Sequence, residues 1–159
     1  MSEHNEDEAA FVVAITRLDA DLALPAYARA GDAGLDLVAR VDVIVRAGGG
    51  RVLVPTGVAV AIPAGYAGFV LPRSGSAARQ GLSIVNTPGL IDSGYRGEVI
   101  VALLNTDRDE DIHITRGDRV AQLVILAVAT VRLVEVATLP ESPGGVASRG
   151  VGGHGHTGR

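Results

Sequence analysis

The chain contains no cysteine and no tryptophan, and its 159 residues include only three Tyr and two Phe. The absence of cysteine excludes disulfide bonds and thiolate metal sites. Because aromatic residues make up only 3% of the sequence, the hydrophobic core has to be built from aliphatic side chains. The longest apolar stretch, residues 120–131, contains Gln122 and Thr130 and is too short to cross a bilayer. We therefore expect no association with a membrane.

An excess of positive charge is also missing. There are 14 basic and 18 acidic residues, which gives a net charge of -4. Proteins that bind duplex nucleic acid non-specifically normally carry charge of the opposite sign, so no nucleic-acid partner is expected. Residues 2–8 are acidic and polar, with neither the basic start nor the apolar run of a signal peptide. We expect a cytoplasmic protein in which any polyanionic ligand meets a local cluster of donors.

What the chain does contain is aliphatic sequence, with 47% of its residues apolar, as in a folded domain. Val-rich stretches favour strands, because β-branched side chains suit a pleated, half-buried surface. Many short strands punctuated by Gly and Pro predict an all-β sandwich or a jelly-roll-like barrel. Strands are expected at residues 11–18, 32–45, 51–62, 66–71, 82–85, 90–91, 98–104, 112–114, 120–127 and 130–136.

Local signals predict how these strands are interrupted. Residues 74–80 are Ala-rich and precede Gly81, which indicates one short helix ended by a glycine. Gly57 is a candidate β-bulge, and residues 63–65 predict a turn. Residues 86–89 read as the tip of a hairpin between two strands. Other connections include a charged surface loop at residues 106–111 and a turn at residues 116–118.

Composition divides the chain into three parts. Residues 1–9 predict a disordered tail, and residues 10–139 predict the β-barrel domain. Seven of the last 20 residues are Gly, so residues 140–159 are expected to form a flexible arm that cannot pack as a strand or helix interior.

Two of five polar clusters interrupt the first half of the apolar pattern. In residues 30–37, Asp32 and Asp36 lie four positions apart beside glycines, which by itself is more typical of an Asp-Gly turn that enters a strand than of a site. Arg73, Ser74 and Gly75 stand between a strand and the predicted helix. Backbone N–H groups at a helix start, an Arg and a hydroxyl can together bind an anion. An N-cap Ser beside a surface Arg is the simpler alternative.

The third cluster, residues 86–98, is the most specific stretch of the chain. Asn86 near the loop tip leads into Asp92, and Tyr95 follows three residues later. A carboxylate can orient and deprotonate a water within hydrogen-bond reach, and the flat face of a Tyr can pack on a sugar. The alternative makes Asp92 a turn residue and Tyr95 a core aromatic. We favour function, because the whole chain has only three Tyr.

The last two clusters lie near the C-terminus. Gln122 interrupts an apolar strand, so its amide either pairs with the backbone or faces a ligand. Residues 148–158 combine glycines with Arg149, His154 and Thr157, as in a loop whose N–H groups point at phosphate. Composition alone favours a linker there. A metal site at the two tail histidines, His154 and His156, is not expected, because phosphate-bound magnesium prefers oxygen ligands.

Taken in order, the five clusters resemble the five sequence motifs of the trimeric dUTPase family, over nearly the whole chain. The most telling stretch is residues 89–98, Gly-Leu-Ile-Asp-Ser-Gly-Tyr-Arg-Gly-Glu. The resemblance implies a jelly-roll-like, distorted β-barrel subunit and a homotrimer whose shared active sites hydrolyse dUTP to dUMP and pyrophosphate. That reaction keeps uracil out of DNA and supplies dUMP for thymidylate synthesis.

The resemblance also implies roles for the third cluster. Asp92 matches the residue that activates the water attacking the α-phosphorus in line. Tyr95 matches the residue beneath the deoxyribose that leaves no room for a 2′-hydroxyl. Asn86 matches the residue that reads the uracil edge, with backbone groups from Gly89 to Ile91 completing the pairing.

The other clusters match the phosphate and magnesium contacts of the family. Arg73, Ser74, Gly75 and Gln122 are the implied phosphate-binding residues. The implied cofactor is Mg²⁺, held mainly by the phosphates, with Asp36 contributing through water, Asp32 a further candidate, and no direct protein ligand.

The arm matches the family segment that closes over the active site of a neighbouring subunit. Arg149 corresponds to the residue that reaches the γ-phosphate, and His154, with Gly155 behind it, stands where a stacking Phe is usual. His156 replaces a common small hydroxyl residue, so Thr157 is the candidate tail hydroxyl. Closure would exclude water and assemble the site.

Two rival functions carry different expectations. A dCTP deaminase, or a bifunctional deaminase and triphosphatase, would share the fold, the trimer and the triphosphate site. The spacing of Asp92 and Tyr95 and the closing arm favour the plain dUTPase. A non-catalytic nucleotide-sensing module would have no need of a water-activating carboxylate, so Asp92 together with Arg73 and Arg149 favours an enzyme.

Overall fold

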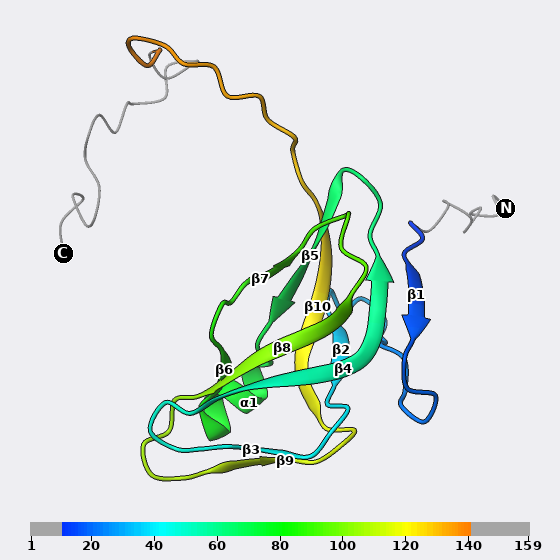
Figure 1. Ribbon diagram of the computed structural model, residues 1–159, viewed down its shortest axis with the longest axis vertical. Coiled ribbons are helices and arrows are strands. Elements are labelled where there is room, and N and C mark those ends of the chain that lie inside the picture. Colours follow the sequence, from blue (N-terminus) through cyan, green and yellow to red (C-terminus); the bar gives the residue numbers. More distant parts are fainter. Residues whose placement is uncertain (1–10, 141–159) are drawn as a thin grey trace, which may run out of the picture. The chain divides into compact units, whose positions relative to one another are not determined.

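A computed structural model of the protein describes residues 11–140 (Figure 1). The tail predicted at residues 1–9, and the arm beyond residue 140, lie outside the described residues. The chain divides into two units, residues 1–129 and residues 130–159. None of the helices in the described part is long and apolar enough to cross a membrane.

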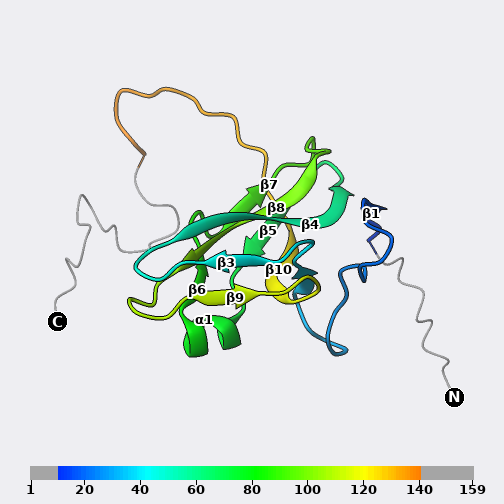
Figure 2. The same cartoon turned by 60° about the horizontal axis from the view of Figure 1, so that its bottom comes forward.

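The first unit consists of two four-stranded antiparallel sheets and a smaller strand pair (Figures 1 and 2). One sheet has the order β1 (Ala14–Arg17), β4 (Arg51–Ala61), β8 (Glu98–Asn105) and β6 (Leu82–Ile84). The other has the order β2 (Leu35–Val38), β10 (Arg119–Ala127), β5 (Tyr66–Leu71) and β7 (Gly89–Ile91). β3 (Val43–Val45) pairs with β9 (Ile112–Ile114). The expected all-β, jelly-roll-like fold is confirmed.

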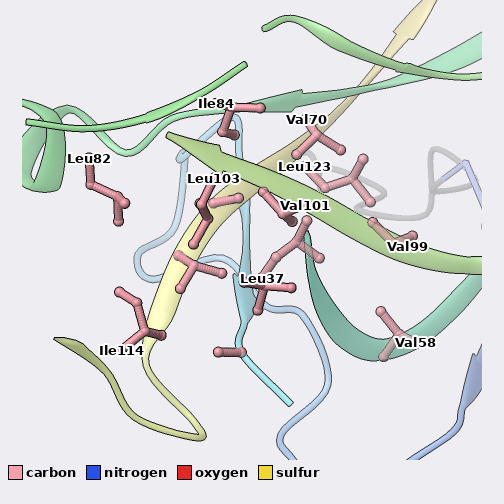
Figure 3. Close-up of a cluster of buried hydrophobic side chains, with 14 of the residues drawn as sticks. Leu37, Val58, Val70, Leu82, Ile84, Val99, Val101, Leu103, Ile114 and Leu123 are labelled. Atoms are coloured by element: carbon pink, nitrogen blue, oxygen red, sulfur yellow. The ribbon is translucent and has the colours of Figure 1, made fainter. Parts of the chain in front are cut away.

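Aliphatic side chains from both large sheets form a single core. Alternate residues of β8, namely Val99, Val101 and Leu103, are buried, as the two-residue period of a strand requires. They meet side chains of the opposite sheet, including Leu123 of β10 and Val70 of β5, in one cluster (Figure 3). The core contains no aromatic side chain that is fully buried in the described chain, in keeping with the composition.

The predicted helix and its terminating glycine are also found. The helix α1 spans Ser74–Gln80 and lies beside β6. Gly81 follows it in the left-handed conformation, with φ 67°, where a glycine avoids the steric cost of a side chain. Gly57 has φ 75° and lies where the register between β4 and β8 shifts, so the predicted bulge is confirmed.

The hairpin predicted around residues 86–89 is wrong. β6 and β7, which flank this loop, do not pair with each other, because β6 pairs with β8 and β7 pairs with β5. Leu82 and Ile84 reach the core from one sheet, and Ile91 reaches it from the other. Since both strands must bury apolar side chains in the same core, the loop passes from one sheet to the other.

The strand predicted at residues 130–136 does not form in the described chain. Its apolar residues are exposed, and Leu133 has 92% of its surface accessible. A strand needs a neighbour to accept and donate its backbone hydrogen bonds. An alternating apolar sequence without such a partner stays irregular.

Ion pairs tie together four loops and strand ends. The guanidinium of Arg116 donates to both carboxylate oxygens of Asp19, at 2.7 and 2.9 Å, and Arg40 donates to the same carboxylate at 3.2 Å. Arg40 also reaches Glu98 at the start of β8. The hydrogen bond from Arg116 is the main cause that lowers the pKa of Asp19 to about 2.

Candidate active site

Residues of the third cluster line a hollow beside β7. This hollow has a volume of about 200 Å³, and Asn86, Gly89, Ile91, Asp92 and Tyr95 all contribute to its wall. Its remaining lining is aliphatic and comes from β5, β6, β7 and β8. Local structure explains the gathering, because β7 ends at Ile91 and the turn that follows carries both Asp92 and Tyr95.

Asp92 and Tyr95 are held in one turn. The backbone N–H of Tyr95 donates to the carbonyl of Asp92 at 3.0 Å. The Tyr95 hydroxyl donates to the carbonyl of Glu98 at 2.9 Å, so the aromatic ring is anchored at its far end. Within residues 11–140 the Asp92 carboxylate accepts no hydrogen bond and forms no ion pair. It is exposed and available to a water or a ligand. Tyr95 is 44% exposed, so it is not a core aromatic.

The backbone of β7 approaches Asn86 closely. A Cβ atom added to Gly89 would lie 3.4 Å from both Asn86 Nδ2 and Val70 Cβ. β7 is an edge strand, paired on one side with β5. The free side therefore offers backbone donors and acceptors next to an exposed Asn amide, which is the arrangement needed to pair with the edge of a planar base.

Residues of the first, second and fourth clusters line a separate hollow. It measures about 540 Å³ and is lined by Asp32, Asp36, Arg73, Ser74, Gly75 and Gln122, together with neighbouring residues. The first turn of α1 forms part of the wall. The N-cap residue of α1 is Arg73 in an extended conformation, no side chain caps the helix, and no acidic residue occupies its first turn. The alternative of an N-cap Ser is therefore wrong, because Ser74 is already helical.

Asp36 organises the charges of this second hollow. Its Oδ1 accepts a hydrogen bond from Arg73 Nε at 2.8 Å, and its Oδ2 accepts one from Arg119 Nη1 at 3.2 Å. The pairing of β2 with β10 places Asp36 opposite Gln122, on the same strand that begins at Arg119. Asp32 instead closes a local turn, accepting the N–H of Arg29 at 2.8 Å. Asp36 thus orients Arg73, whereas Asp32 matches the simple turn interpretation.

The side chain of Gln122 both pairs with the backbone and lines a hollow. Its amide nitrogen donates to the carbonyl of Pro72 at 2.9 Å, so the backbone satisfies one end of the side chain. Its amide oxygen faces Gly34, where an added Cβ atom would lie only 2.7 Å away. The same residue lines the second hollow. The bond to Pro72 therefore fixes the amide just before the Arg73 segment.

The two hollows have no lining residue in common. The residues predicted to contact the base and the water lie together in one hollow, and the residues predicted to contact phosphate lie together in the other, so a single chain keeps the two groups apart. Arg149, His154, Gly155 and Thr157 lie outside the described residues.

Sequence comparison decides the family. The family model named dUTPase matches residues 20–158. The chain is 56% identical over 146 residues to a deoxyuridine 5′-triphosphate nucleotidohydrolase of Thermobifida fusca, covering 92% of this chain and 78% of that protein. It is also 56% identical over 146 residues to the Mycobacterium tuberculosis enzyme of the same name, covering 92% and 94%.

This chain belongs to the dUTPase family.

Solved structures agree with this assignment. A mutant dUTPase of Staphylococcus bacteriophage 80alpha with bound dUpNHpp superposes with a TM-score of 0.83 at 27% identity, covering 93% of this chain and 99% of that one. A mutant dUTPase from phage phi11 of S. aureus gives a TM-score of 0.74 at 26% identity, covering 80% and 98%. The phi11 structure describes the coordination of a structural Mg(II) ion.

The sequence did not point to one charged residue of the second hollow. Arg79 lines the second hollow, and its guanidinium folds back along α1 until Nη1 would lie 3.0 Å from a Cβ atom at Gly75. Within residues 11–140, Arg79 pairs with no carboxylate, whereas Arg73 is held by Asp36. The available signal was its spacing of four residues from Gly75, which puts both on one face of a helix.

The carboxylates suit magnesium bound through water better than direct coordination. Asp32 and Asp36 supply the hard oxygen atoms that Mg²⁺ prefers. Both oxygens of Asp36 are already engaged by guanidinium groups, and one oxygen of Asp32 accepts a backbone N–H. No group of three or more His, Asp or Glu side chains in residues 11–140 could hold a metal ion. The donor set fits an ion carried by phosphate groups.

Proposed function

We propose that this protein hydrolyses dUTP to dUMP and pyrophosphate in the cytoplasm, with Asp92 as the general base. One observation carries the proposal: in a chain of the dUTPase family, an exposed carboxylate that has no partner among residues 11–140 lies in the same hollow as Tyr95 and Asn86. A base has to be free to accept a proton from water, and this carboxylate meets that condition.

In the proposed reaction, the Asp92 carboxylate takes a proton from a water as the water oxygen bonds to the α-phosphorus. The bond between this phosphorus and the oxygen bridging to the β-phosphate breaks, and the electron pair leaves with pyrophosphate. In-line attack requires the water and the leaving group to lie on opposite sides of the phosphorus. The turn that fixes Asp92 beside Tyr95 gives the base a defined position relative to the sugar.

Recognition of the nucleoside is assigned to the same hollow. The Asn86 amide and the free backbone edge from Gly89 to Ile91 would pair with uracil, and the narrow loop would leave no room for the methyl group of thymine. The anchored ring of Tyr95 would pack under the deoxyribose and exclude a 2′-hydroxyl.

Recognition of the triphosphate is assigned to the second hollow. The guanidinium of Arg73 and the uncapped N–H groups at Ser74 and Gly75 supply donors to phosphate oxygens, and Gln122 supports this segment. A bound Mg²⁺ ion would neutralise charge that develops on the pyrophosphate. Asp36 would hold such an ion through water while keeping Arg73 oriented.

We infer that the active enzyme is a homotrimer, because a single chain separates the two groups of site residues. Exposed apolar side chains at Leu53 of β4, at Ile100 of β8 and at Val85 just after β6 support assembly, with Leu53 67% accessible. The exposed apolar segment at residues 130–136 offers a strand that a neighbouring subunit could pair. A Leu53→Glu variant should give monomers in analytical ultracentrifugation and lose activity. An active monomer would refute shared sites.

The arm is assigned the closing step, with Arg149 at the γ-phosphate, His154 on the uracil, and Gly155 and Thr157 beside them. Deleting residues 149–159 should lower turnover while the assembly and the thermal unfolding midpoint stay unchanged. If the truncated protein unfolds, the arm is structural.

The deciding experiment measures the products formed from dUTP, UTP, dTTP and dCTP side by side. We expect pyrophosphate and dUMP from dUTP, with little reaction of the other three. Ammonia released from dCTP would identify the deaminase alternative. Binding of dUTP without turnover would identify a nucleotide-sensing module.

A further inference from the structure

The ring of Tyr95 rests directly on Gly97. A Cβ atom added to Gly97 would lie 2.5 Å from the Tyr95 hydroxyl oxygen, 2.7 Å from Cζ and 3.2 Å from Cε2. The backbone of Gly97 is not in the left-handed region, because Gly97 is not one of the glycines with a positive φ. The space taken by the ring, and not the backbone conformation, therefore requires glycine at this position.

The other side of the phenol is fixed by β8. The Tyr95 hydroxyl donates to the carbonyl of Glu98 at 2.9 Å. The Glu98 carboxylate accepts the N–H of Gly57 at 2.7 Å and lies 3.3 Å from Arg40 Nη1. These contacts hold Glu98 at the bulge of β4, so the carbonyl that receives the phenol does not move freely. The ring is thus confined between an anchored hydrogen bond and a residue without a side chain.

We propose that Gly97 is a positioning residue that sets the discrimination between deoxyribose and ribose through the place of the Tyr95 ring. The proposal rests on the proposed function, in which Tyr95 packs under the sugar. Gly97 itself does not touch the nucleotide in this proposal. Its contribution is the absence of a methyl group where the phenol has to lie.

The position of the Tyr95 ring is sensitive to a side chain at residue 97. To bring the hydroxyl oxygen from 2.5 Å to an ordinary contact distance with a new methyl group, the phenol has to move by about 1 Å. Movement away from the sugar opens space for a 2′-hydroxyl, and movement toward it obstructs dUTP as well. Movement away from the sugar admits UTP, so the preference for dUTP over UTP falls.

The test compares Gly97→Ala with Gly94→Ala in the same turn. A Cβ atom at Gly94 would meet nothing within 4 Å, and its φ is likewise outside the positive region, which makes it a matched control. For each full-length variant, kcat/KM is measured with dUTP and with UTP. We expect Gly97→Ala to lower the ratio of the two by about tenfold or more, and Gly94→Ala to leave it within about twofold of the wild-type ratio.

A ratio of specificity constants separates positioning from loss of folded enzyme, because the concentration of active sites cancels. An unchanged ratio in Gly97→Ala, or an equal fall in both glycine variants, would overturn the proposal. If Gly97→Ala does not fold, Tyr95→Phe decides, since it removes the bond to the Glu98 carbonyl. Its ratio should fall by about threefold or more, and an unchanged ratio refutes the anchored ring. Wild-type protein that fails to prefer dUTP refutes the proposed function instead.

Discussion

Replacing Asp92 by Asn should separate catalysis from folding more cleanly than any other single change. The Asp92 carboxylate is exposed and makes no hydrogen bond or ion pair within residues 11–140, and its backbone carbonyl, not its side chain, accepts the N–H of Tyr95. An amide of the same shape therefore removes no stabilising contact. It removes only the ability to take a proton from water.

The size of the effect follows from that role. General-base catalysis contributes about 10²–10⁴-fold to rate, so turnover of dUTP should fall by about 100-fold or more. A loss of 100-fold corresponds to about 2.7 kcal/mol in the activation free energy. Binding of dUTP should persist, because Asn86, Tyr95 and the phosphate-binding residues are unchanged. The thermal unfolding midpoint should stay within about 1–2 °C of the wild-type value, as for a surface substitution.

The assay is pyrophosphate release under saturating dUTP, with the dissociation constant of dUTP measured separately by calorimetry. Asp109→Asn is the matched control, because Asp109 is also exposed and lies in the charged loop at residues 106–111, which lines neither hollow. Wild-type turnover in Asp92→Asn would refute the assigned base. Lost turnover accompanied by lost dUTP binding would show that Asp92 serves binding instead.

Three further outcomes test other parts of the molecule. Arg79→Gln should raise KM for dUTP by about tenfold, or about 1.4 kcal/mol, while Arg108→Gln in the charged loop should leave KM unchanged. Equal KM values in both variants would show that Arg79 of the second hollow does not bind phosphate. The pKa of Asp19 is lowered from 3.8 to about 2, so its ion pairs stabilise the fold above about pH 4 and lose this effect as the pH falls toward 2. The difference in urea midpoint between wild type and Asp19→Asn should therefore shrink over that interval, and a constant difference would contradict the shift. Leu103 is fully buried, so Leu103→Ala should lower the free energy of unfolding by about 2–5 kcal/mol in urea titrations, and a loss below about 1 kcal/mol would indicate a core that closes over the gap.

Local patterns in the sequence predicted most of the elements. The helix at Ser74–Gln80 and the strand at Tyr66–Leu71 have the predicted bounds. The bulge at Gly57 and the glycine that ends α1 were also predictable, because a positive φ is a property of one residue and its immediate neighbours. Such features depend on contacts within a few positions along the chain.

Pairing between strands was harder to predict. An apolar alternation shows that residues 82–85 and 90–91 are strands with a buried face, but it contains no information about which strand lies beside them. For that reason the local pattern predicts a hairpin between β6 and β7, although the loop crosses from one sheet to the other. Residues 130–136 have the same alternation and no partner in the described chain, so the pattern alone predicted a strand that did not form.

For the site, the sequence by itself determined the family, since five polar clusters in a fixed order identify it, and it predicted which residues carry the chemistry. Only the tertiary structure decided how they are grouped: Asp92 with Tyr95 and Asn86 in one hollow, and Asp36 paired with Arg73 in another. It also added Arg79 and the contact between Tyr95 and Gly97. These facts depend on distances between side chains, which are set by sheet register and core packing and cannot be read from the order of residues along a chain.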